Sequence, residues 1–411
     1  MRILVIEYGI GGFSQGELIE EILLEGYAML RALIEDLKKA EYYVITTIDS
    51  RFKKHCQLKA DEIITVPKDK NPLKLLKTYL TRIDGAIIIA PAFKEALYGI
   101  TCFFEKEKIK ILGSTSNAVK ICSNKYKTYN ILKDARISIP KTILGSLHED
   151  MKSLEEKALK IGYPVVLKPV DGVGCAGLSL VSKKEELKDA VERVRNETQE
   201  CYFLIQEYLE GDHASVSLLS NGEKVAALAL NAQHIKLGPP GEGSIYEGGH
   251  TPFEHPSESL AIDEAVKAVK AIKGLKGYVG VDLVLTGEKP VVVEVNPRLT
   301  TSYLGLREIL TINIGAEIVK ASHSLEIPTN MGKKGYAIIG KIRFNEGFTL
   351  NNEKVKMISE VDGVISHLLI PKPHLHPKED VAIVVSKGES LEGAKQHFEE
   401  IKQKIYEVLT S

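Results

Sequence analysis

A chain of 411 residues is too long for one ordinary hydrophobic core, so two or three packed subdomains are expected. Its 54 Lys and Arg residues balance 55 Asp and Glu residues for a net charge of -1, which speaks against nucleic acid or a membrane surface as a partner. No apolar stretch approaches the roughly 20 residues that span a bilayer. Five scattered cysteines without a C-x-x-C pair argue against a zinc site or a disulfide framework, so a cytoplasmic location is expected.

The first part of the chain, residues 1–120, has the pattern of an N-terminal α/β domain. Apolar runs typical of buried strands fall at 3–6, 43–47, 86–90 and 109–113, and a long amphipathic helix follows the first run. The turn Gly9-x-Gly11-Gly12 resembles a dinucleotide-binding turn, but Asp49 lies about forty residues further on instead of the ~20 residues of that fingerprint. A structural turn, or a wall of the substrate cleft, is the better interpretation.

The remainder alternates short strands with helices, which makes the whole chain an α/β protein. Strands are expected at 165–168, 178–181, 202–207, 215–219, 226–233, 280–285, 291–295, 335–343 and 381–386, and helices at 125–135, 153–161, 184–194, 258–272 and 390–409. A loop rich in Gly and Pro runs from 237 to 256. We divide this part into a core at 121–330 and a C-terminal α+β extension at 331–411. No acidic or Pro-rich linker separates them, so the subdomains are expected to pack together.

The strongest local feature is a glycine-rich loop between two strands. It runs Lys168-Pro169-Val170-Asp171-Gly172-Val173-Gly174-Cys175-Ala176-Gly177. Glycines let backbone N–H groups converge on an anion without Cβ atoms in the way, and Lys168 adds a positive charge at the base of the loop. The loop differs from the Walker sequence G-x-x-x-x-G-K-[ST], so phosphate binding and a plain glycine-rich hairpin are equally compatible with it.

Two consecutive strands carry acidic residues. Asp282 lies in one apolar run, Glu294 interrupts the next, and Asn296 follows two residues later. Side chains two residues apart in a strand share a face, so Glu294 and Asn296 point together, and the neighbouring strand can supply Asp282. Two carboxylates and an amide suit Mg²⁺ together with nucleotide phosphates. A surface Asp and a capping Asn form the structural alternative, which is weaker because a buried carboxylate requires a cation.

Three further features follow in order. The strand at 202–207 ends in Gln206-Glu207-Tyr208-Leu209-Glu210-Gly211, where backbone groups can meet an adenine edge, although an ordinary strand end has the same pattern. Lys125 stands at a helix start, and Arg298 follows Asn296-Pro297. A single Lys or Arg is normally a solvated charge. Lys125 and Arg298 therefore indicate a function only through their order along the chain relative to the other motifs.

In that order, the segment from about 115 to 325 resembles the ATP-grasp family, in which two α+β subdomains clamp ATP. The resemblance implies a Rossmann-like N-terminal domain, a lid subdomain at about 140–210, and residues 171–177 as a mobile loop. It implies ATP and one or two Mg²⁺ or Mn²⁺ ions as cofactors, with Asp282, Glu294 and Asn296 as metal ligands. Lys168 and Arg298 would act in catalysis, Arg298 by stabilising acyl-phosphate oxygens.

The same resemblance implies a set of residues in contact with ATP. They are Lys125, Lys168, Gly172, Gly174, Cys175, Ala176, Gly177, Gln206, Glu207, Tyr208, Leu209, Asp212 and His213. Lys125 and Lys168 would hold the phosphates, and the strand end would hold the adenine. One departure concerns the ribose: many members place an acid where this chain has His213, with Asp212 beside it.

A narrower similarity connects the chain with the family of archaeal tyramine–glutamate ligases of methanofuran biosynthesis. The segments that carry it are EGYAML at 25–30, YEGGH at 246–250 and NPRLTTSY at 296–303. The similarity implies a ligase that joins the γ-carboxylate of L-glutamate to the amine of tyramine through an acyl phosphate, releasing ADP and phosphate. The substrate-site candidates are Glu247, Gly248, Gly249, Ser302, Tyr303 and Arg307, for which ordinary loop chemistry is equally compatible.

Two other functions remain open. An ATP-grasp ligase with another acid and amine, or a carboxylase, would carry the same motifs, although a carboxylase needs a biotin-carrying partner and the chain has no obvious biotinylation sequence. A non-catalytic nucleotide-binding regulatory protein is the alternative of another class, and the complete set of Asp282, Glu294 and Asn296 counts against it. Small-molecule substrates are the expected partners. A homodimer is compatible with such a fold, but the sequence identifies no interface.

Overall fold

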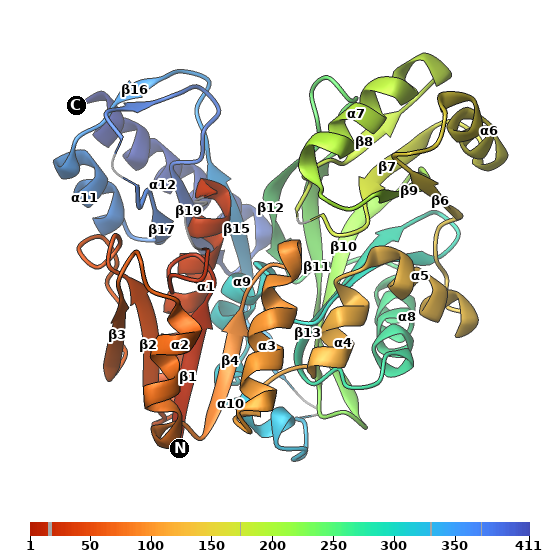
Figure 1. The fold of residues 1–411 in the computed structure, drawn as a ribbon. Coiled ribbons are helices and arrows are strands. Elements are labelled where there is room, and N and C mark those ends of the chain that lie inside the picture. The colour runs from red at the N-terminus through yellow and green to blue at the C-terminus, as the bar shows by residue number, and fades with distance from the viewer. Residues whose placement is uncertain (15–18, 173, 329–330, 371) are drawn as a thin grey trace.

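The computed structural model describes residues 1–14, 19–172, 174–328, 331–370 and 372–411. Three sheets of four or more strands organise these residues, and helices cover them, which confirms the predicted α/β class. Figure 1 shows the N-terminal domain and the large central sheet side by side, with the lid subdomain and the C-terminal extension standing apart above them. In the described part of the chain, no helix is long and apolar enough to cross a membrane.

The N-terminal domain is built on a parallel sheet with the strand order β3-β2-β1-β4-β5. Its strands are β1 (Arg2–Glu7), β2 (Tyr43–Asp49), β3 (Glu62–Val66), β4 (Gly85–Ile89) and β5 (Lys110–Ile111). Its helices are α1 (Glu20–Lys39), α2 (Pro72–Leu76), α3 (Ala96–Lys106) and α4 (Ser116–Cys122), with 3₁₀ turns η1 (Lys77–Arg82) and η2 (Phe93–Glu95). The chain leaves β1 toward β2 on one side and later enters β4 on the other. The topological switch point, where open α/β sheets bind ligands, therefore lies at the carboxyl ends of β1 and β4.

The lid subdomain is a small antiparallel sheet with two α-helices and one short 3₁₀ helix. Its strands have the order β6-β9-β7-β8. They are β6 (Thr142–Ser146), β7 (Val165–Pro169), β8 (Ser179–Val181) and β9 (Tyr202–Glu207), and the helices are α6 (Met151–Ile161), η3 (Lys184–Glu186) and α7 (Leu187–Glu197). Leu154, Val165, Leu167 and Phe203 belong to a separate hydrophobic cluster. The lid therefore has its own core, which allows it to move as one body.

The central sheet joins the predicted core and the C-terminal extension. Its order is β14-β13-β10-β11-β12-β15-β19-β17, with antiparallel pairing throughout. The strands are β10 (Asp212–Ser220), β11 (Val225–Lys236), β12 (Ile245–Thr251), β13 (Gly277–Leu285), β14 (Pro290–Asn296), β15 (Tyr336–Ile342), β17 (Val364–His367) and β19 (Ala382–Gly388). A two-stranded ribbon is formed by β16 (Phe348–Thr349) and β18 (His374–Leu375). The helices of this part are α5 (Lys125–Asp134), α8 (Glu258–Ala271), α9 (Ser302–Ile309), α10 (Ile314–Ser322), α11 (Asn352–Glu360) and α12 (Leu391–Thr410).

A buried polar contact attaches the N-terminal domain to the central sheet. Asp36 of α1 is 5% exposed, and its carboxylate accepts hydrogen bonds from the Tyr303 hydroxyl at 2.5 Å and from Arg307 Nε and Nη2 at 3.0 and 2.7 Å. Its main-chain oxygen accepts a further bond, from Asn313 Nδ2 at 2.8 Å. Because α1 also carries residues near the candidate active site, this contact fixes the position of α1 relative to that site.

Candidate active site

The acidic residues of β13 and β14 meet where the two strands pair. Asp282 lies directly opposite Glu294, and Gly280 lies opposite Asn296, so the three polar side chains share one face of the sheet. Asp282 is fixed from both sides: its Oδ1 accepts a bond from Gln233 Nε2 at 3.0 Å, and its Oδ2 accepts one from Asn296 Nδ2 at 2.9 Å. The predicted set of two carboxylates and one amide is therefore brought together in space.

Two lysines approach these carboxylates from different elements. Lys125 is the first residue of α5, whose start is capped by Asn124, and its Nζ lies 2.9 Å from Glu294 Oε1. The same Nζ donates to the main-chain oxygen of Gly172, at 2.5 Å. Lys168 lies on β7 and is 4% exposed. Lys125 therefore connects the central sheet with the glycine loop of the lid.

The charged groups of the site shift one another's pKa values. Loss of water contact, followed by the charge of Glu294, raises the pKa of Asp282 to about 7. Desolvation also acts on Glu294, but Lys125 and Lys168 outweigh it and hold the pKa of Glu294 below its ordinary value. Burial lowers the pKa of Lys168 to about 8, although the charge of Glu294 opposes this change. Two carboxylates are thus forced together in a site poor in water, an arrangement that favours a cation between them.

The donor set suits a divalent metal that is shared with a nucleotide. Among the described residues, no group of three or more His, Cys, Asp or Glu side chains is arranged to hold a metal ion. Asp282, Glu294 and Asn296 supply three oxygen-bearing groups, which leaves most of the octahedron of Mg²⁺ to phosphate oxygens and water. The residues therefore fit an ion that binds together with ATP.

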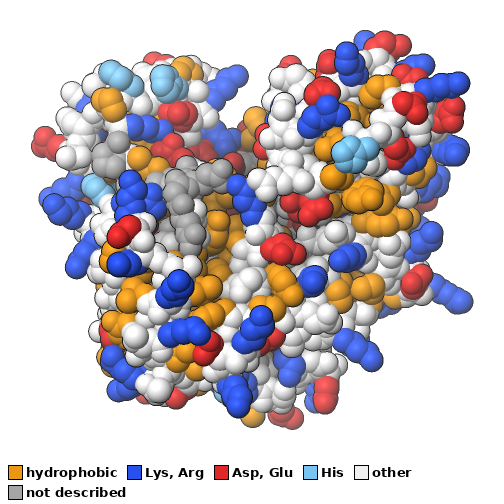
Figure 2. All heavy atoms as spheres, in the orientation of Figure 1, with side chains coloured by type: hydrophobic (Ala, Val, Ile, Leu, Met, Phe, Trp, Pro, Cys, Tyr) orange, Lys and Arg blue, Asp and Glu red, His pale blue; other side chains and the backbone are white. Residues whose placement is uncertain are grey.

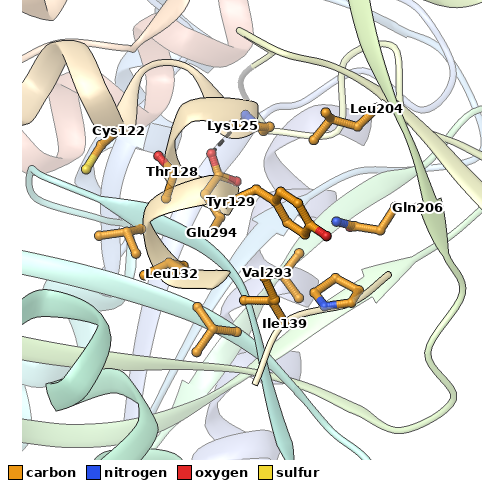
Figure 3. A pocket seen from close by; sticks show the side chains of 13 residues that line it. Cys122, Lys125, Thr128, Tyr129, Leu132, Ile139, Leu204, Gln206, Val293 and Glu294 are labelled. Atoms are coloured by element: carbon orange, nitrogen blue, oxygen red, sulfur yellow. Dashed lines mark ion pairs between the residues drawn. The ribbon is translucent and has the colours of Figure 1, made fainter. Parts of the chain in front are cut away.

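A pocket extends from the Lys125–Glu294 ion pair between α5, β9 and β14. It encloses about 360 Å³ of space, its open mouth included, and its lining residues are Cys122, Lys125, Thr128, Tyr129, Leu132, Ile139, Pro140, Leu204, Gln206 and Val292–Val295. Figure 3 shows the ion pair at one end, and Tyr129 and Gln206 pointing toward each other at the other. Gln206 is 6% exposed, and its Nε2 donates to Thr142 Oγ1 at 2.8 Å. A charged end and an apolar end with a fixed amide match the phosphates and the base of a nucleotide.

Tyr129 was absent from the residues predicted for this pocket. It lies four residues after Lys125 on α5, and residues four apart occupy the same helix face. The sequence therefore contained a usable signal, because a helix that directs Lys125 into the site must direct Tyr129 to the same side.

The glycine loop lies beside the same charges. Gly174 and Gly177 have φ values of +59° and +69°, which other residues rarely adopt, and a Cβ on Gly177 would lie 2.8 Å from the Pro169 ring. Gly172 is fixed by its bond to Lys125, whereas Gly174 and Ala176 are exposed. Burial raises the pKa of the Cys175 thiol, so a reactive thiolate is not favoured there. Val173 lies outside the described residues.

At the strand end predicted to hold adenine, some backbone groups already form hydrogen bonds within the protein. The Glu207 N–H donates to the Lys141 oxygen at 2.9 Å, its carboxylate accepts from the Lys141 N–H at 2.8 Å, and the Tyr208 N–H donates to Pro164 at 3.3 Å. For Leu209, the described residues offer its N–H no hydrogen-bond partner. Of the groups predicted to bind the base, the Leu209 N–H is therefore one that is available.

The two ribose candidates lie at the start of β10. Asp212 is 65% exposed, and its Oδ2 lies 3.5 Å from His255 Nε2. His213 pairs with Val284, two residues along β13 from Asp282, so both candidate side chains, His213 and Asp282, project from one face. Burial lowers the pKa of His213, so it is present as neutral imidazole at pH 7.

A row of charges continues from the metal candidates to the N-terminal domain. Arg298 donates to the Leu299 oxygen at 2.9 Å. Burial lowers the pKa of its guanidinium, and the charges of Glu25, Glu294 and Asp282 oppose this change. Glu25 lies on α1 and is 2.8 Å from Nζ of Lys341, a residue of β15 whose side chain is 4% exposed. Glu25 and Lys341 were not predicted from the sequence, and both lie at the meeting of the N-terminal domain with the central sheet. Figure 2 shows a deep notch between the lid and the C-terminal extension, with charged side chains of both signs at its base.

The predicted substrate residues after Arg298 have partners within the protein. The Ser302 Oγ lies 3.4 Å from the Ser215 Oγ in the core. Tyr303 is 0% exposed, and both Tyr303 and Arg307 are bound to Asp36. We interpret Tyr303 and Arg307 as parts of the domain interface and Ser302 as part of the core of the central sheet.

Residues 247–249 have a mainly structural position on β12. A Cβ on Gly248 would lie 2.0 Å from the Ile339 oxygen, and one on Gly249 would lie 2.0 Å from the Ala232 oxygen. Only glycine therefore allows β12 to pair with both of its neighbours. Glu247 is exposed, and its charge acts on Arg343 and His234.

Comparison with known proteins identifies the family of the chain. A family model described as an ATP-grasp domain matches residues 122–302. The chain is 32% identical over 328 residues to the tyramine–L-glutamate ligase of Methanocaldococcus jannaschii, which covers 77% of this chain and 91% of that one. It is 33% identical over 309 residues to the enzyme of the same name from Methanocaldococcus fervens, covering 74% and 89%.

Solved structures share the fold at lower identity. The L-amino acid ligase from Bacillus licheniformis has a TM-score of 0.70 and 18% identity, covering 98% of this chain and 97% of that one. The biotin carboxylase from Campylobacter jejuni has a TM-score of 0.73 and 16% identity, covering 99% and 94%. At such identities the likeness concerns the fold alone.

Proposed function

The chain belongs to the ATP-grasp family and is an ATP-dependent carboxylate–amine ligase, and from this premise we propose that it joins the γ-carboxylate of L-glutamate to the amine of tyramine. The ATP-grasp fold expected from the sequence is confirmed. The observation that carries the proposed chemistry is the convergence of Lys125, Lys168, Asp282 and Glu294 at one end of a pocket, with Arg298 beside them. The substrate pair is supported by two relatives that bear this name and are matched over about nine-tenths of their length.

The proposed reaction has two steps. A glutamate carboxylate oxygen attacks the γ-phosphorus of ATP, so that an acyl phosphate forms and ADP leaves. The amine then attacks the acyl carbon, the amide bond forms, and inorganic phosphate leaves with its electron pair while the amine loses a proton. Neither step requires a protein nucleophile, because positioning and charge neutralisation lower both barriers.

Each charged residue has a distinct part in this scheme. Lys168 and Lys125 neutralise the phosphoryl group in transfer, and Arg298 stabilises the acyl-phosphate oxygens. Asp282, Glu294 and Asn296 would hold a Mg²⁺ or Mn²⁺ ion, which when bound supplies positive charge to the nucleotide phosphates. The glycine loop, tethered through Gly172 to Lys125, excludes water from the acyl phosphate.

A coupled ADP-release assay with product mass spectrometry tests this function. The purified protein is given ATP, Mg²⁺ and L-glutamate, with and without tyramine. We expect ADP release that depends on both substrates and a product of the mass of glutamyl-tyramine. Product with another amine alone would keep the ligase and reject tyramine, whereas tight ATP binding without release under any pairing would reject catalysis.

The Glu294→Gln variant examines the role of the carboxylates. We expect its turnover to fall by about a hundredfold or more while ATP binding persists, because the ion that Glu294 would help to hold neutralises the phosphoryl group mainly during its transfer. Glu288→Gln is the matched control, since Glu288 is exposed in the turn between β13 and β14. Near-normal ligation by Glu294→Gln would contradict the metal assignment.

A further inference from the structure

A second pocket lies in the N-terminal domain, apart from the nucleotide pocket. It is lined by Tyr8 and Phe93, which follow β1 and β4, by Ile19, Ile22 and Leu23 at the start of α1, and by Ser14. Its position is the topological switch point of the parallel sheet, the place where open α/β sheets receive ligands. The mechanism above gives this pocket no role.

The lining has the character of a ring-binding site. Two aromatic rings and three aliphatic side chains border an open groove of about 300 Å³, its opening to solvent included, and Ile19 is 45% exposed although it is strongly apolar. One polar atom interrupts the apolar wall: the Ser14 Oγ is buried, and the described residues offer it no hydrogen-bond partner. A buried hydroxyl without a partner is costly, and a ligand that brings a hydroxyl group would remove that cost.

The pocket lies close to the reacting end of the site along α1. Ile22 and Glu25 are three residues apart, so they lie on one helix face and are separated by about one turn, ~5 Å along the axis. Glu25 lies 2.8 Å from Lys341 Nζ, and that nitrogen lies 5.7 Å from the centre of the Tyr246 ring. The Tyr246 hydroxyl lies 2.9 Å from the Thr301 Oγ1, three residues after Arg298.

We propose that this pocket binds the aromatic ring of a hydroxyarylalkylamine substrate, and that Glu25 receives its ammonium group beside Arg298. The assignment rests on the proposed ligase function and specifies where its amine substrate binds. A two-carbon arm between ring and nitrogen spans about the distance of one helical turn. The ring would contact Ile22 and Phe93, the ring hydroxyl would pair with the Ser14 Oγ, and the nitrogen would face the acyl phosphate.

A panel of amines tests the pocket on the unaltered protein. With ATP and L-glutamate saturating, we expect kcat/KM to be highest for tyramine, lower for phenethylamine, and at least about tenfold lower again for n-propylamine, which has no ring. Equal efficiency with n-propylamine and tyramine would overturn the pocket while leaving the ligase function intact. Ser14→Ala should narrow the gap between tyramine and phenethylamine, because the hydroxyl contact is lost.

A substitution that fills the pocket with a larger side chain supplies the complementary test. Ile22→Phe adds volume at the half-buried Ile22 and should raise the KM for tyramine at least about tenfold, while the KM for L-glutamate and for ATP stays unchanged. Ile63→Phe is the control, since Ile63 is 41% exposed on β3 of the same domain. A rise in all three KM values would indicate a general structural effect and reject the assignment.

Calorimetry separates the failure of the pocket from the failure of the proposed function. Tyramine is titrated into protein that holds a non-hydrolysable ATP analogue, so no turnover is needed. Binding to the unaltered chain that is lost in Ile22→Phe supports the pocket even if no product forms. Equal binding to both proteins would overturn the pocket even if the ligase is active.

Discussion

Glu7 is an ionisable residue whose side chain is almost completely buried. It ends β1 and is 1% exposed, and its Oε2 accepts the Ile10 N–H at 2.5 Å. A Cβ on Gly26 would lie 2.1 Å from its Oε1, so α1 presses directly on the carboxylate. Burial raises the pKa of Glu7 to about 7 from an ordinary 4.5, against three backbone hydrogen bonds that favour the ion.

This shift predicts a pH dependence of stability that Glu7→Gln removes. Because the folded-state pKa lies above the unfolded one, the contribution of Glu7 is fully present below pH 4.5 and is lost as the pH rises through about 7. Between pH 4.5 and 8, the unfolding free energy of the Gln variant should therefore gain roughly 3 kcal/mol relative to the natural chain. Urea unfolding at several pH values measures this difference. A constant difference across the range would show that Glu7 is already ionised in the folded protein.

The chemistry of single residues was predictable where the residues lie close in sequence or on paired strands. Glu294 and Asn296 share a face because they are two residues apart, and Lys168 stands at the base of its own loop. Glu25 and Lys341 meet only through folding, across more than three-quarters of the chain, and each alone looks like a solvated charge. Their contact therefore could not be predicted from a single sequence.

The packing of α1 against α9 depends on one carboxylate. Asp36 binds the buried Tyr303 hydroxyl and two nitrogens of Arg307, whose side chain is 8% exposed. Asp36→Ala removes a partner of both groups and leaves the Arg307 guanidinium largely buried, where Glu308 at 3.0 Å and Glu35 at 3.4 Å compensate only in part. We expect the unfolding free energy, measured by urea denaturation, to fall by about 3 kcal/mol, because a buried charge without its partner destabilises the folded state.

An exposed ion pair elsewhere in the protein serves as the control for Asp36. Glu360→Ala on α11 breaks the pair with Lys356, in which both side chains are mostly exposed, and should cost less than about 0.5 kcal/mol. Similar losses in the two variants would show that the contact of α1 with α9 adds no more than a surface pair.

Whole elements were predictable in proportion to their apolar patterns. The expected helix at 390–409 corresponds to α12, and the strands at 280–285 and 291–295 lie within β13 and β14. The sequence did not predict β6, which is an edge strand of its sheet with one buried residue. It also did not predict β12, which falls within the expected loop at 237–256. Gly248 and Gly249 in that strand resemble a turn, whereas the structure requires them for close strand pairing.

The lid is connected to the rest of the molecule by more than its chain ends. Residues 237–244, between β11 and β12, lie against it: the Leu180 N–H donates to the Gly238 oxygen at 2.9 Å, and the Ser244 Oγ donates to the Leu178 oxygen at 3.1 Å. Arg193 of α7 donates to the Pro240 oxygen at 3.2 Å. A Cβ on Gly243 would lie 2.1 Å from the Arg193 guanidinium, so this loop is shaped to receive it. Opening of the lid must break these bonds or move the loop with it.

The Arg193→Ala variant should therefore separate ATP consumption from amide formation. Loss of a hydrogen bond from a charged group, about 1.5 kcal/mol, raises the fraction of open lids by about tenfold and admits water to the acyl phosphate. We expect more ADP released per amide formed, measured by ADP release and product mass spectrometry on the same samples. Arg195→Ala is the matched control, because Arg195 lies on the same helix and its bonds to the residues that the structure describes stay within the lid, to Glu192 and to the Leu147 oxygen. Acyl phosphate that is exposed to water cannot give a complete yield of amide. If Arg193→Ala still forms one amide per ADP released, the 237–244 loop moves with the lid without holding it closed.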